Sequence, residues 1–306
     1  MSGVDARVRP AAGRTRSWLL IVPLAIAAGS YLAAMAYMKV NERSFVYHPE
    51  LYGGRGMVAP AADLRVTATR IRSIDSLELS TWTIPPADSA TALGYWLIVN
   101  HGNAGNISLA LRQEWSRALA AQGVGIVSYD YRSYGVSDDG PLDEEALYRD
   151  AQSVYDWMVR VKGIDPQRII IYGHSLGSGV ATHLAANVEA AGMILEGAFT
   201  SIPDLGASRY PWMPIRLLSG ERFASVERID SIAMPKLFMH ASDDGVIPFE
   251  FGKRLYDAAP APKEFVTLTG GHDRAFAADS ATYFSAIGKF VRRIATVDVE
   301  SAALPD

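Results

Sequence analysis

The fold is decided by one stretch of the chain, Arg168-Ile169-Ile170-Ile171-Tyr172-Gly173-His174-Ser175-Leu176-Gly177-Ser178-Gly179. The apolar and β-favouring residues before Gly173 predict a short buried strand, and residues 180–187 predict a helix. Between them, Gly173, Ser175 and Gly177 match the G-x-S-x-G pattern of a nucleophile elbow. A serine on so sharp a turn has a strained backbone, so the residues two before and two after it must lack bulk. A glycine- and serine-rich turn without chemistry is the alternative, and the strand and helix around the motif disfavour it.

Further strands and helices alternate on both sides of this stretch. Strands are predicted at 64–71, 77–84, 95–99, 124–129, 192–195, 237–240 and 265–268, and helices at 106–122, 144–162 and 280–294. This alternation predicts an α/β fold with a doubly wound, mostly parallel sheet of about eight strands. The first two strands are expected to form an antiparallel hairpin edge around Asp75-Ser76.

The alternation lapses after residue 199, where an apolar segment interrupted by prolines, 210–218, predicts a short cap at about 200–233. An insertion at this point lies over the carboxyl edge of the sheet, where ligands bind in such folds. Trp212 and Met213 are therefore candidates for contact with an apolar substrate. Packing on the body beneath is an equally weighted alternative.

A serine hydroxyl needs a base to take its proton, and the base needs an orienting carboxylate. In an elbow-type fold the order along the chain is serine, acid, histidine, which selects His272 as the base. The acid is expected after the strand that ends at His240, and we predict Asp244. Its neighbour Asp243 is then a turn or capping residue, and Glu196 is an outside candidate for the acid.

The loop 100–106, Asn-His-Gly-Asn-Ala-Gly-Asn, follows a buried strand and precedes a helix. Acyl transfer places negative charge on the substrate oxygen, which preorganised N–H donors stabilise. We predict an oxyanion hole formed by the backbone N–H groups of Leu176 and Asn103. His101 is expected to brace this loop, and Asp130 and Arg132 could form an internal ion pair that supports it.

The N-terminal region is predicted to anchor the chain in a membrane. Residues 1–16 form a basic tail, and the 22 residues 17–38 carry no charge, enough for a helix of roughly 33 Å. A signal anchor is favoured over a cleaved signal peptide, for which Ala34-Met35-Ala36 offers a cleavage spacing, and over a buried core helix. The excess of arginine before the helix places the N-terminus in the cytoplasm and the catalytic domain on the far side, periplasmic or extracellular.

The expected organisation is a connector at 39–62, a hydrolase domain at 63–296 and a C-terminal tail at 297–306. The net charge of −4 and the lack of a basic stripe argue against a nucleic-acid partner. The chain has no cysteine, which excludes disulfides, thiol catalysis and zinc-thiolate sites. Residues with metal-ligand spacing are not evident, so neither a metal nor another cofactor is expected.

Together these residues resemble the α/β-hydrolase superfamily, and within it the membrane-anchored serine hydrolases with HGNAGN, DYRxYGxS and GHSLGSG blocks, a group that includes protein depalmitoylases. The resemblance covers about residues 45–291. It implies Ser175 as nucleophile, Asp244 by its position four residues before Pro248, and His272 as base. The depalmitoylase branch carries an N-terminal cysteine cluster that this chain lacks, which favours a more general esterase.

The expected function is hydrolysis of carboxylic esters or thioesters, with apolar acyl groups, through an acyl-enzyme intermediate. Small acyl esters and the membrane are the expected partners. A non-catalytic binding protein of the same fold is one alternative, which the complete set of serine, acid and histidine disfavours. A serine peptidase is the other, and it usually carries a large additional domain for which this chain has no room.

Overall fold

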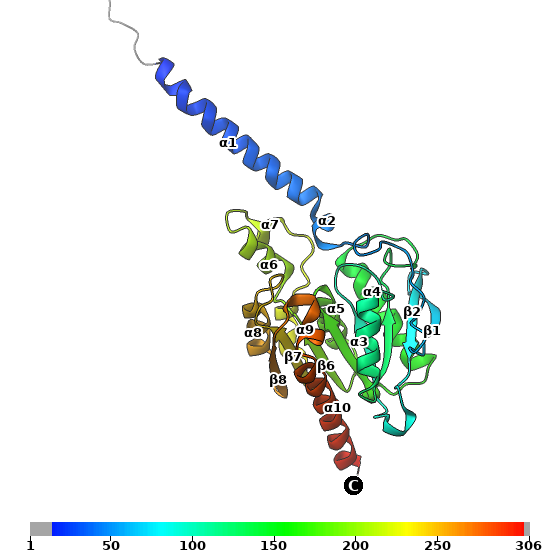
Figure 1. Ribbon diagram of the computed structural model, residues 1–306. Helices are drawn as coiled ribbons and strands as arrows, with labels where there is room; N and C mark the ends of the chain where they lie inside the picture. Colours follow the sequence, from blue (N-terminus) through cyan, green and yellow to red (C-terminus); the bar gives the residue numbers. More distant parts are fainter. Residues whose placement is uncertain (1–13, 303–306) are drawn as a thin grey trace, which may run out of the picture. The chain divides into compact units, whose positions relative to one another are not determined.

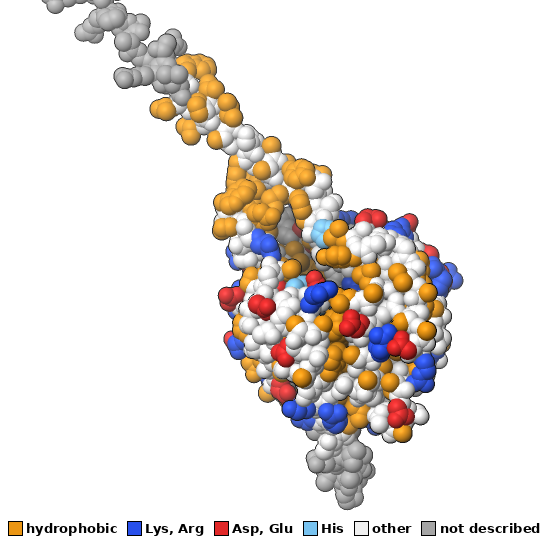
Figure 2. All heavy atoms as spheres, in the orientation of Figure 1, with side chains coloured by type: hydrophobic (Ala, Val, Ile, Leu, Met, Phe, Trp, Pro, Cys, Tyr) orange, Lys and Arg blue, Asp and Glu red, His pale blue; other side chains and the backbone are white. Residues whose placement is uncertain are grey.

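The structure is a computed structural model that describes residues 14–302 of the chain. The chain divides into two compact units, one ending at Glu42 and the other beginning at Arg43. The first unit contains helix α1 (Arg14–Val40), in which Leu20–Val40 is long and apolar enough to cross a membrane. Figure 2 shows hydrophobic side chains along this helix, whereas the second unit, here called the body, displays a mixed surface with charges of both signs.

The body is built on one eight-stranded sheet with the order β1-β2-β4-β3-β5-β6-β7-β8 (Figure 1). The strands are β1 (Thr67–Arg72), β2 (Glu78–Ile84), β3 (Trp96–Asn100), β4 (Gly125–Tyr129), β5 (Ile169–His174), β6 (Gly192–Glu196), β7 (Lys236–Ala241) and β8 (Lys263–Leu268). The six strands from β4 to β8 in this order are parallel, while β1 and β2 form an antiparallel hairpin at one edge. The predicted fold class is therefore confirmed.

Helices connect and cover the strands. They are α2 (Glu42–Val46), α3 (Ala110–Ala120), α4 (Glu144–Arg160), α5 (Leu176–Ala185), α6 (Ile202–Arg209), α7 (Ile215–Leu218), α8 (Phe249–Ala258), α9 (Gly271–Ala278) and α10 (Ser280–Ala302), with short 3₁₀ turns η1 (Ser89–Thr91), η2 (Pro166–Arg168), η3 (Ser225–Glu227) and η4 (Ile229–Ser231). Helices α6 and α7 lie between β6 and β7, in the segment predicted as a cap.

Alternate residues of each central strand enter two separate cores. On one face, Ile98, Ile171 and Leu195 pack with side chains of α4, α5 and α8. On the other face, the preceding residues, among them Ile170 and Ile194, pack with α3, α9 and α10. A strand that is buried on both faces reads as a continuous apolar run, as these strands do. The two cores hold the sheet on both faces. The polar residues described below lie on the loops at its carboxyl edge.

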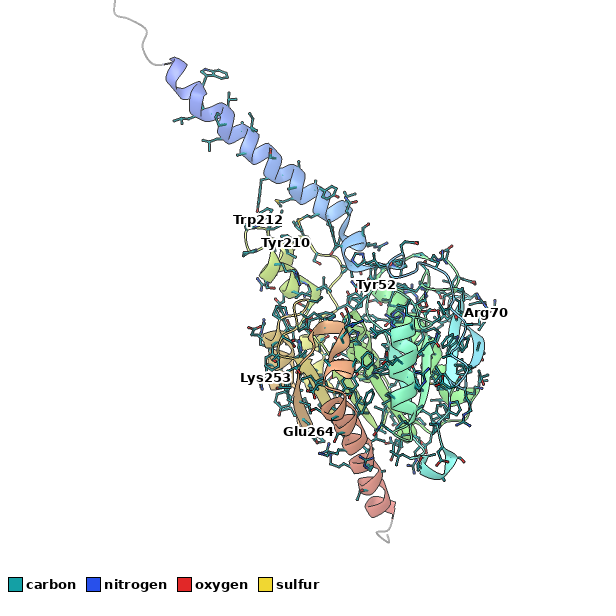
Figure 3. All side chains as sticks on the ribbon, in the orientation of Figure 1. Tyr52, Arg70, Tyr210, Trp212, Lys253 and Glu264 are labelled. Atoms are coloured by element: carbon teal, nitrogen blue, oxygen red, sulfur yellow. The ribbon has the colours of Figure 1, made fainter. Side chains whose placement is uncertain are left out.

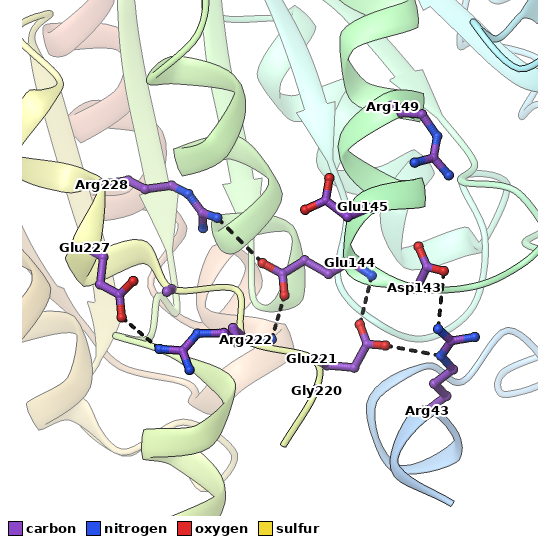
Figure 4. A pocket seen from close by; sticks show the side chains of 11 residues that line it. Arg43, Asp143, Glu144, Glu145, Arg149, Gly220, Glu221, Arg222, Glu227 and Arg228 are labelled. Atoms are coloured by element: carbon purple, nitrogen blue, oxygen red, sulfur yellow. Dashed lines mark hydrogen bonds and ion pairs between the residues drawn. The ribbon is translucent and has the colours of Figure 1, made fainter. Parts of the chain in front are cut away.

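A charged hollow of about 490 Å³ lies beside the start of α4 (Figure 4). In it, the Glu221 Oε2 atom accepts hydrogen bonds from the Tyr47 hydroxyl at 2.5 Å and from the Glu144 backbone N–H at 2.8 Å. Arg43 donates to Glu221 at 3.2 Å and to Asp143 at 3.3 Å. These bonds join the first residues of the body, the start of α4 and the cap segment into one polar cluster.

Some helices differ from their predicted bounds. Helix α3 begins at Ala110 rather than at 106, because the Asn106 side chain accepts from the Ser108 N–H and closes a local turn instead of capping the helix. Helix α5 begins directly at Leu176 rather than at 180. Helix α8 and helix α9, which contains His272, were not predicted.

Candidate active site

Ser175 lies on the sharp turn between β5 and α5, with φ 54° and ψ −124°. Its backbone N–H donates to the Glu196 carbonyl oxygen at 3.0 Å, which fixes the turn to the end of β6. A Cβ atom on Gly177 would lie 2.0 Å from the Asn100 carbonyl oxygen, and one on Gly173 would lie 2.4 Å from the Gly177 carbonyl oxygen. Neither position therefore accepts a side chain, as the elbow pattern predicts.

The structure brings Ser175, His272 and Asp244 into one hydrogen-bonded row. The Ser175 Oγ atom lies 2.8 Å from His272 Nε2, and His272 Nδ1 lies 2.7 Å from Asp244 Oδ2. A carboxylate only accepts hydrogen bonds, so the Nδ1–H group donates to Asp244 and leaves Nε2 to accept from the serine. This is the geometry in which an imidazole can take the proton of an attacking hydroxyl.

Asp244 is held in place by the loop that carries it. Its Oδ1 atom accepts from the backbone N–H groups of Val246 and Ile247, each at 2.8 Å, and its Oδ2 atom lies 3.4 Å from His240 Nε2. Burial opposes ionisation here, but the hydrogen bonds of His240 and His272 outweigh it and hold the pKa of Asp244 well below its usual range. The Asp244 carboxylate is therefore ionised at every pH at which His272 is neutral and can act as a base.

Asp243 faces away from the row, as its predicted capping role requires. Its carboxylate accepts from the backbone N–H groups of Gly270 at 3.0 Å and Gly271 at 3.1 Å. These two glycines directly precede His272 and both have positive φ. Asp243 thus fixes the turn that presents the imidazole.

The pKa of His272 is the result of opposing effects. Burial lowers it, whereas the hydrogen bond and the charge of Asp244 raise it, and the net effect is a pKa above the usual histidine value. This is the direction expected when an ionised carboxylate stabilises the imidazolium form. His272 can therefore accept a proton more readily than a free imidazole.

Two residues near His272 were missed by sequence reasoning. Gly197, with φ 54°, lies so close that a Cβ atom there would be 3.2 Å from His272 Cε1. The His174 ring lies 5.0 Å from the His272 ring, and its Nε2 atom lies 3.1 Å from the His272 carbonyl oxygen. Gly197 could have been found from its place directly after a buried strand. His174 could not, because the G-x-S-x-G pattern allows any residue at that position.

His174, His272 and Asp273 carry donor atoms that all lie within 4.8 Å of one another, close enough to hold a metal ion. Sequence spacing did not reveal this group, because 98 residues separate the bonded His174 and His272. Both ring nitrogens of His272 already face Ser175 and Asp244, so a metal ion there would compete with the row.

The start of α5 and the loop 100–106 both lie beside Ser175. Leu176 is the first residue of α5, so its N–H group has no acceptor within the helix. Gly102 lies against the elbow, since a Cβ atom on it would be 3.3 Å from the Ser175 Cβ atom. The predicted oxyanion loop is thus adjacent to the candidate nucleophile.

Asn103 is fixed in this loop by three hydrogen bonds. Its carbonyl oxygen accepts from the His48 backbone N–H at 2.9 Å and from the Tyr134 hydroxyl at 2.8 Å, and its side chain donates to the Val46 carbonyl oxygen at 3.0 Å. The connector before the sheet therefore helps to hold the loop.

The suggested ion pair between Asp130 and Arg132 is wrong. Arg132 instead donates to Asp150 on α4 at 2.6 Å and to Asp75 in the hairpin at 2.7 Å. Two residues two apart face the same side only while a strand continues, but β4 ends at Tyr129 and the chain turns after it. Arg132 thus joins the hairpin to α4.

Asp130 lies beside the loop 100–106. Its Oδ1 atom accepts from the Ile107 N–H at 2.8 Å and lies 3.6 Å from His101 Nε2. The other ring nitrogen of His101 lies 2.7 Å from the Gly102 carbonyl oxygen. His101 therefore contacts both Asp130 and the backbone of its own loop, consistent with the bracing role expected for it.

Three further candidate residues are Glu196, Trp212 and Met213. The Glu196 carboxylate accepts from the hydroxyl groups of Tyr172 and Tyr283, the latter at 2.5 Å, and so is occupied in the core. In the cap, Met213 is buried, whereas Trp212 is exposed.

The sequence of residues 96–300 matches the alpha/beta hydrolase family. An uncharacterized protein of Mycobacterium tuberculosis is 33% identical over 261 residues, which cover 84% of this chain and 89% of that protein. The lysophosphatidylserine lipase ABHD12 of Danio rerio is 36% identical over 181 residues, 53% of this chain, and this chain spans about half of that protein's length (47%).

Solved structures show the same fold. The esterase Pf2001 of Pyrococcus furiosus superposes with a TM-score of 0.66 at 17% sequence identity, covering 81% of this chain and 99% of that one. The alpha/beta hydrolase GrgF of a Penicillium species superposes with a TM-score of 0.62 at 17% identity, covering 76% of this chain.

Proposed function

Since this chain belongs to the alpha/beta hydrolase family, we propose that it is a membrane-anchored serine hydrolase that cleaves carboxylic esters or thioesters through an acyl-enzyme intermediate. The observation that carries the proposal is the row in which Ser175, His272 and Asp244 lie 2.8 Å and 2.7 Å apart. A hydroxyl, an imidazole and a buried carboxylate in this order are the parts that acyl transfer requires.

The proposed reaction has two halves. In the first, Ser175 attacks the acyl carbon while His272 takes its proton, and the same imidazole then gives that proton to the leaving oxygen or sulfur. The N–H groups of Leu176 and Asn103 bind the oxyanion of each tetrahedral intermediate. In the second half, water attacks the acyl carbon while His272 takes its proton. The bond to Ser175 then breaks, His272 returns the proton to the serine oxygen, and the carboxylic acid is released.

The proposed substrates are esters of apolar acyl chains that reside in or near a membrane. A chain with a candidate membrane span meets such lipids readily, and ABHD12 is named a lipase of a lysophospholipid. We propose further that the N-terminus is cytoplasmic and that the body lies on the far side, because the arginines precede the helix.

An active-site fluorophosphonate probe tests the reaction class. The full chain in detergent should be labelled, and Ser175→Ala should abolish labelling. Ser178→Ala is the matched control, because its hydroxyl lies one turn along α5, is buried and has no hydrogen-bond partner. Labelling that persists in Ser175→Ala, or is absent from the folded wild type, would reject the proposal.

A panel of p-nitrophenyl esters of increasing chain length tests the substrate class. If the cap binds acyl chains, the kcat/KM for medium and long chains should exceed that for acetate, by about tenfold for each pair of methylene groups that is fully buried. An acetate-only profile would leave the serine chemistry intact and reject the apolar acyl substrate.

A further inference from the structure

Three large apolar side chains of the cap are exposed, and we call them the apolar rim: Tyr210 at 44%, Trp212 at 59% and Leu217 at 88%. The rings of Tyr210 and Trp212 lie 6.4 Å apart and perpendicular to each other. Figure 3 shows both residues at the edge of the body that carries α6 and α7, away from Lys253 and Glu264. Exposed apolar groups that gather in one place indicate an interaction surface.

The apolar rim belongs to the same segment that borders the active site. The chain leaves β6 at Glu196, whose carbonyl oxygen accepts from the Ser175 N–H, and passes through Gly197, which lies against His272, just before it enters the cap. Whatever covers the rim therefore lies at the edge of the sheet where a substrate would arrive.

The chain itself indicates that this cover is a lipid bilayer. The candidate span ends at Val40, and Arg43 is already bound to Asp143 and Glu221 of the body. Three residues extend at most about 11 Å, so this part of the body stays near the surface of any bilayer that the span crosses. Glu221 lies only four residues beyond Leu217 in the cap.

The residue types of the apolar rim fit this partner. Tyrosine and tryptophan combine an apolar ring with a polar atom and are enriched at the boundary between lipid headgroups and acyl chains. A leucine beside them adds apolar area that gains free energy when it leaves water.

We propose that the apolar rim inserts into the headgroup region of the bilayer that the N-terminal helix crosses, so that the active site receives its ester directly from the membrane. The proposal rests on the proposed function for its second part. Its first part, the insertion, can be tested without any activity.

The absence of native cysteine makes a clean test possible. Leu217→Cys in the full chain gives one site for a polarity-sensitive fluorophore, and the protein is reconstituted in phosphatidylcholine–phosphatidylglycerol nanodiscs with or without brominated lipid. The matched control is Val161→Cys, 70% exposed and also apolar, at the far end of α4 from the charged hollow. The 17 residues of this helix extend about 25 Å.

Insertion predicts that brominated lipid quenches the label at position 217 and leaves the label at 161 unquenched. Equal quenching at both positions, or none at 217, would overturn the proposal. A blue-shifted label at 217 that lipid does not quench would also overturn it, because a second protein chain would then cover the rim.

Activity provides the second arm. Leu217→Glu should lower hydrolysis of a long-chain ester embedded in the nanodisc by about tenfold, with a water-soluble short-chain ester unaffected and Val161→Glu unchanged on both. A parallel loss on both esters, or no loss on either, would contradict delivery from the membrane. If the wild type hydrolyses neither ester, the proposed function fails, while the quenching result still decides insertion.

Discussion

At the scale of single residues, the row depends on the charge of Asp244 behind His272. The carboxylate orients the ring and raises the pKa of His272 above its usual value. An imidazole serves as a base only when neutral, so the activity should fall as the pH decreases through this raised pKa. The acid limb of kcat/KM should accordingly lie above the pH at which a free imidazole titrates, about 6.5.

Replacing Asp244 with asparagine tests this assignment. We expect kcat to fall by about 10³- to 10⁴-fold, because the ring loses its orienting partner. The pKa of His272 should also decrease, which shifts the remaining acid limb to lower pH. Asp243→Asn is the matched control: its amide oxygen can still accept from Gly270 and Gly271 and hold the turn, so it should retain the wild-type limb. A pH profile unchanged in Asp244→Asn would contradict the assignment.

Asp130 should make the free energy of unfolding depend on pH. Burial raises the pKa of Asp130 to about 7, although the Ile107 N–H and the charge of Arg112 oppose it. The folded state therefore binds this proton more tightly than the unfolded chain, whose aspartate titrates near 3.9. The contribution of Asp130 to the free energy of unfolding is therefore present in full below about pH 4 and is lost as the pH rises through 7.

Asp130→Asn should flatten this dependence. Urea unfolding of the full chain in detergent, measured at pH 5 and pH 7.5, should show a smaller difference in the variant than in the wild type. The exposed Asp63→Asn should behave like the wild type. An Asp130→Asn variant with the wild-type difference would mean that other groups carry the pH dependence.

At the scale of elements, the hydrogen bonds in the charged hollow hold the cap segment and the connector against α4. The Tyr47 hydroxyl is buried and donates to Glu221 at 2.5 Å. Tyr47→Phe leaves this acceptor without one of its donors and should lower the free energy of unfolding by about 1–3 kcal/mol. The exposed Tyr52→Phe should change it by less than about 0.5 kcal/mol. Equal urea midpoints for the two variants would disprove the role of this bond.

The strands could be predicted from sequence more closely than the helices that follow them. A strand buried on both faces is a run such as Ile169–Tyr172, which its short length, its β-branched residues and the glycine after it distinguish from a buried helix. Helix starts depend on side-chain bonds that the sequence does not specify, as the local turn of Asn106 illustrates. Helix α9 was missed because the residue that precedes it, Gly270, has no side chain to cap the helix.

The positions of the candidate site residues followed from chain order, but their surroundings did not. Ser175, Asp244 and His272 were selected by the order typical of an elbow-type fold, and the structure brings them together. The contacts of Gly197 and His174 with His272 join residues 75 or more positions apart, which no local pattern encodes. For the same reason the partners of Arg132 were assigned wrongly.

At the scale of the whole molecule, the orientation in the membrane can be tested with introduced cysteines, since the chain has none. Ile74→Cys, at the exposed hairpin turn, should react with a membrane-impermeant maleimide added outside intact cells, after outer-layer permeabilisation where needed. Ser2→Cys should react only after the membrane is dissolved. The reverse pattern would place the body in the cytoplasm and refute the proposed orientation.

The backbone of Ser175, at φ 54° and ψ −124°, is a conformation that suits glycine. Alanine keeps the conformational penalty of this site and glycine removes it, so Ser175→Gly should unfold at a higher temperature than Ser175→Ala, by an amount equivalent to about 1–3 kcal/mol. Elsewhere in a protein, glycine in place of alanine normally reduces robustness. A variant with higher thermal stability at this position would then be inactive, and the protein keeps its reactive hydroxyl at a cost in unfolding temperature.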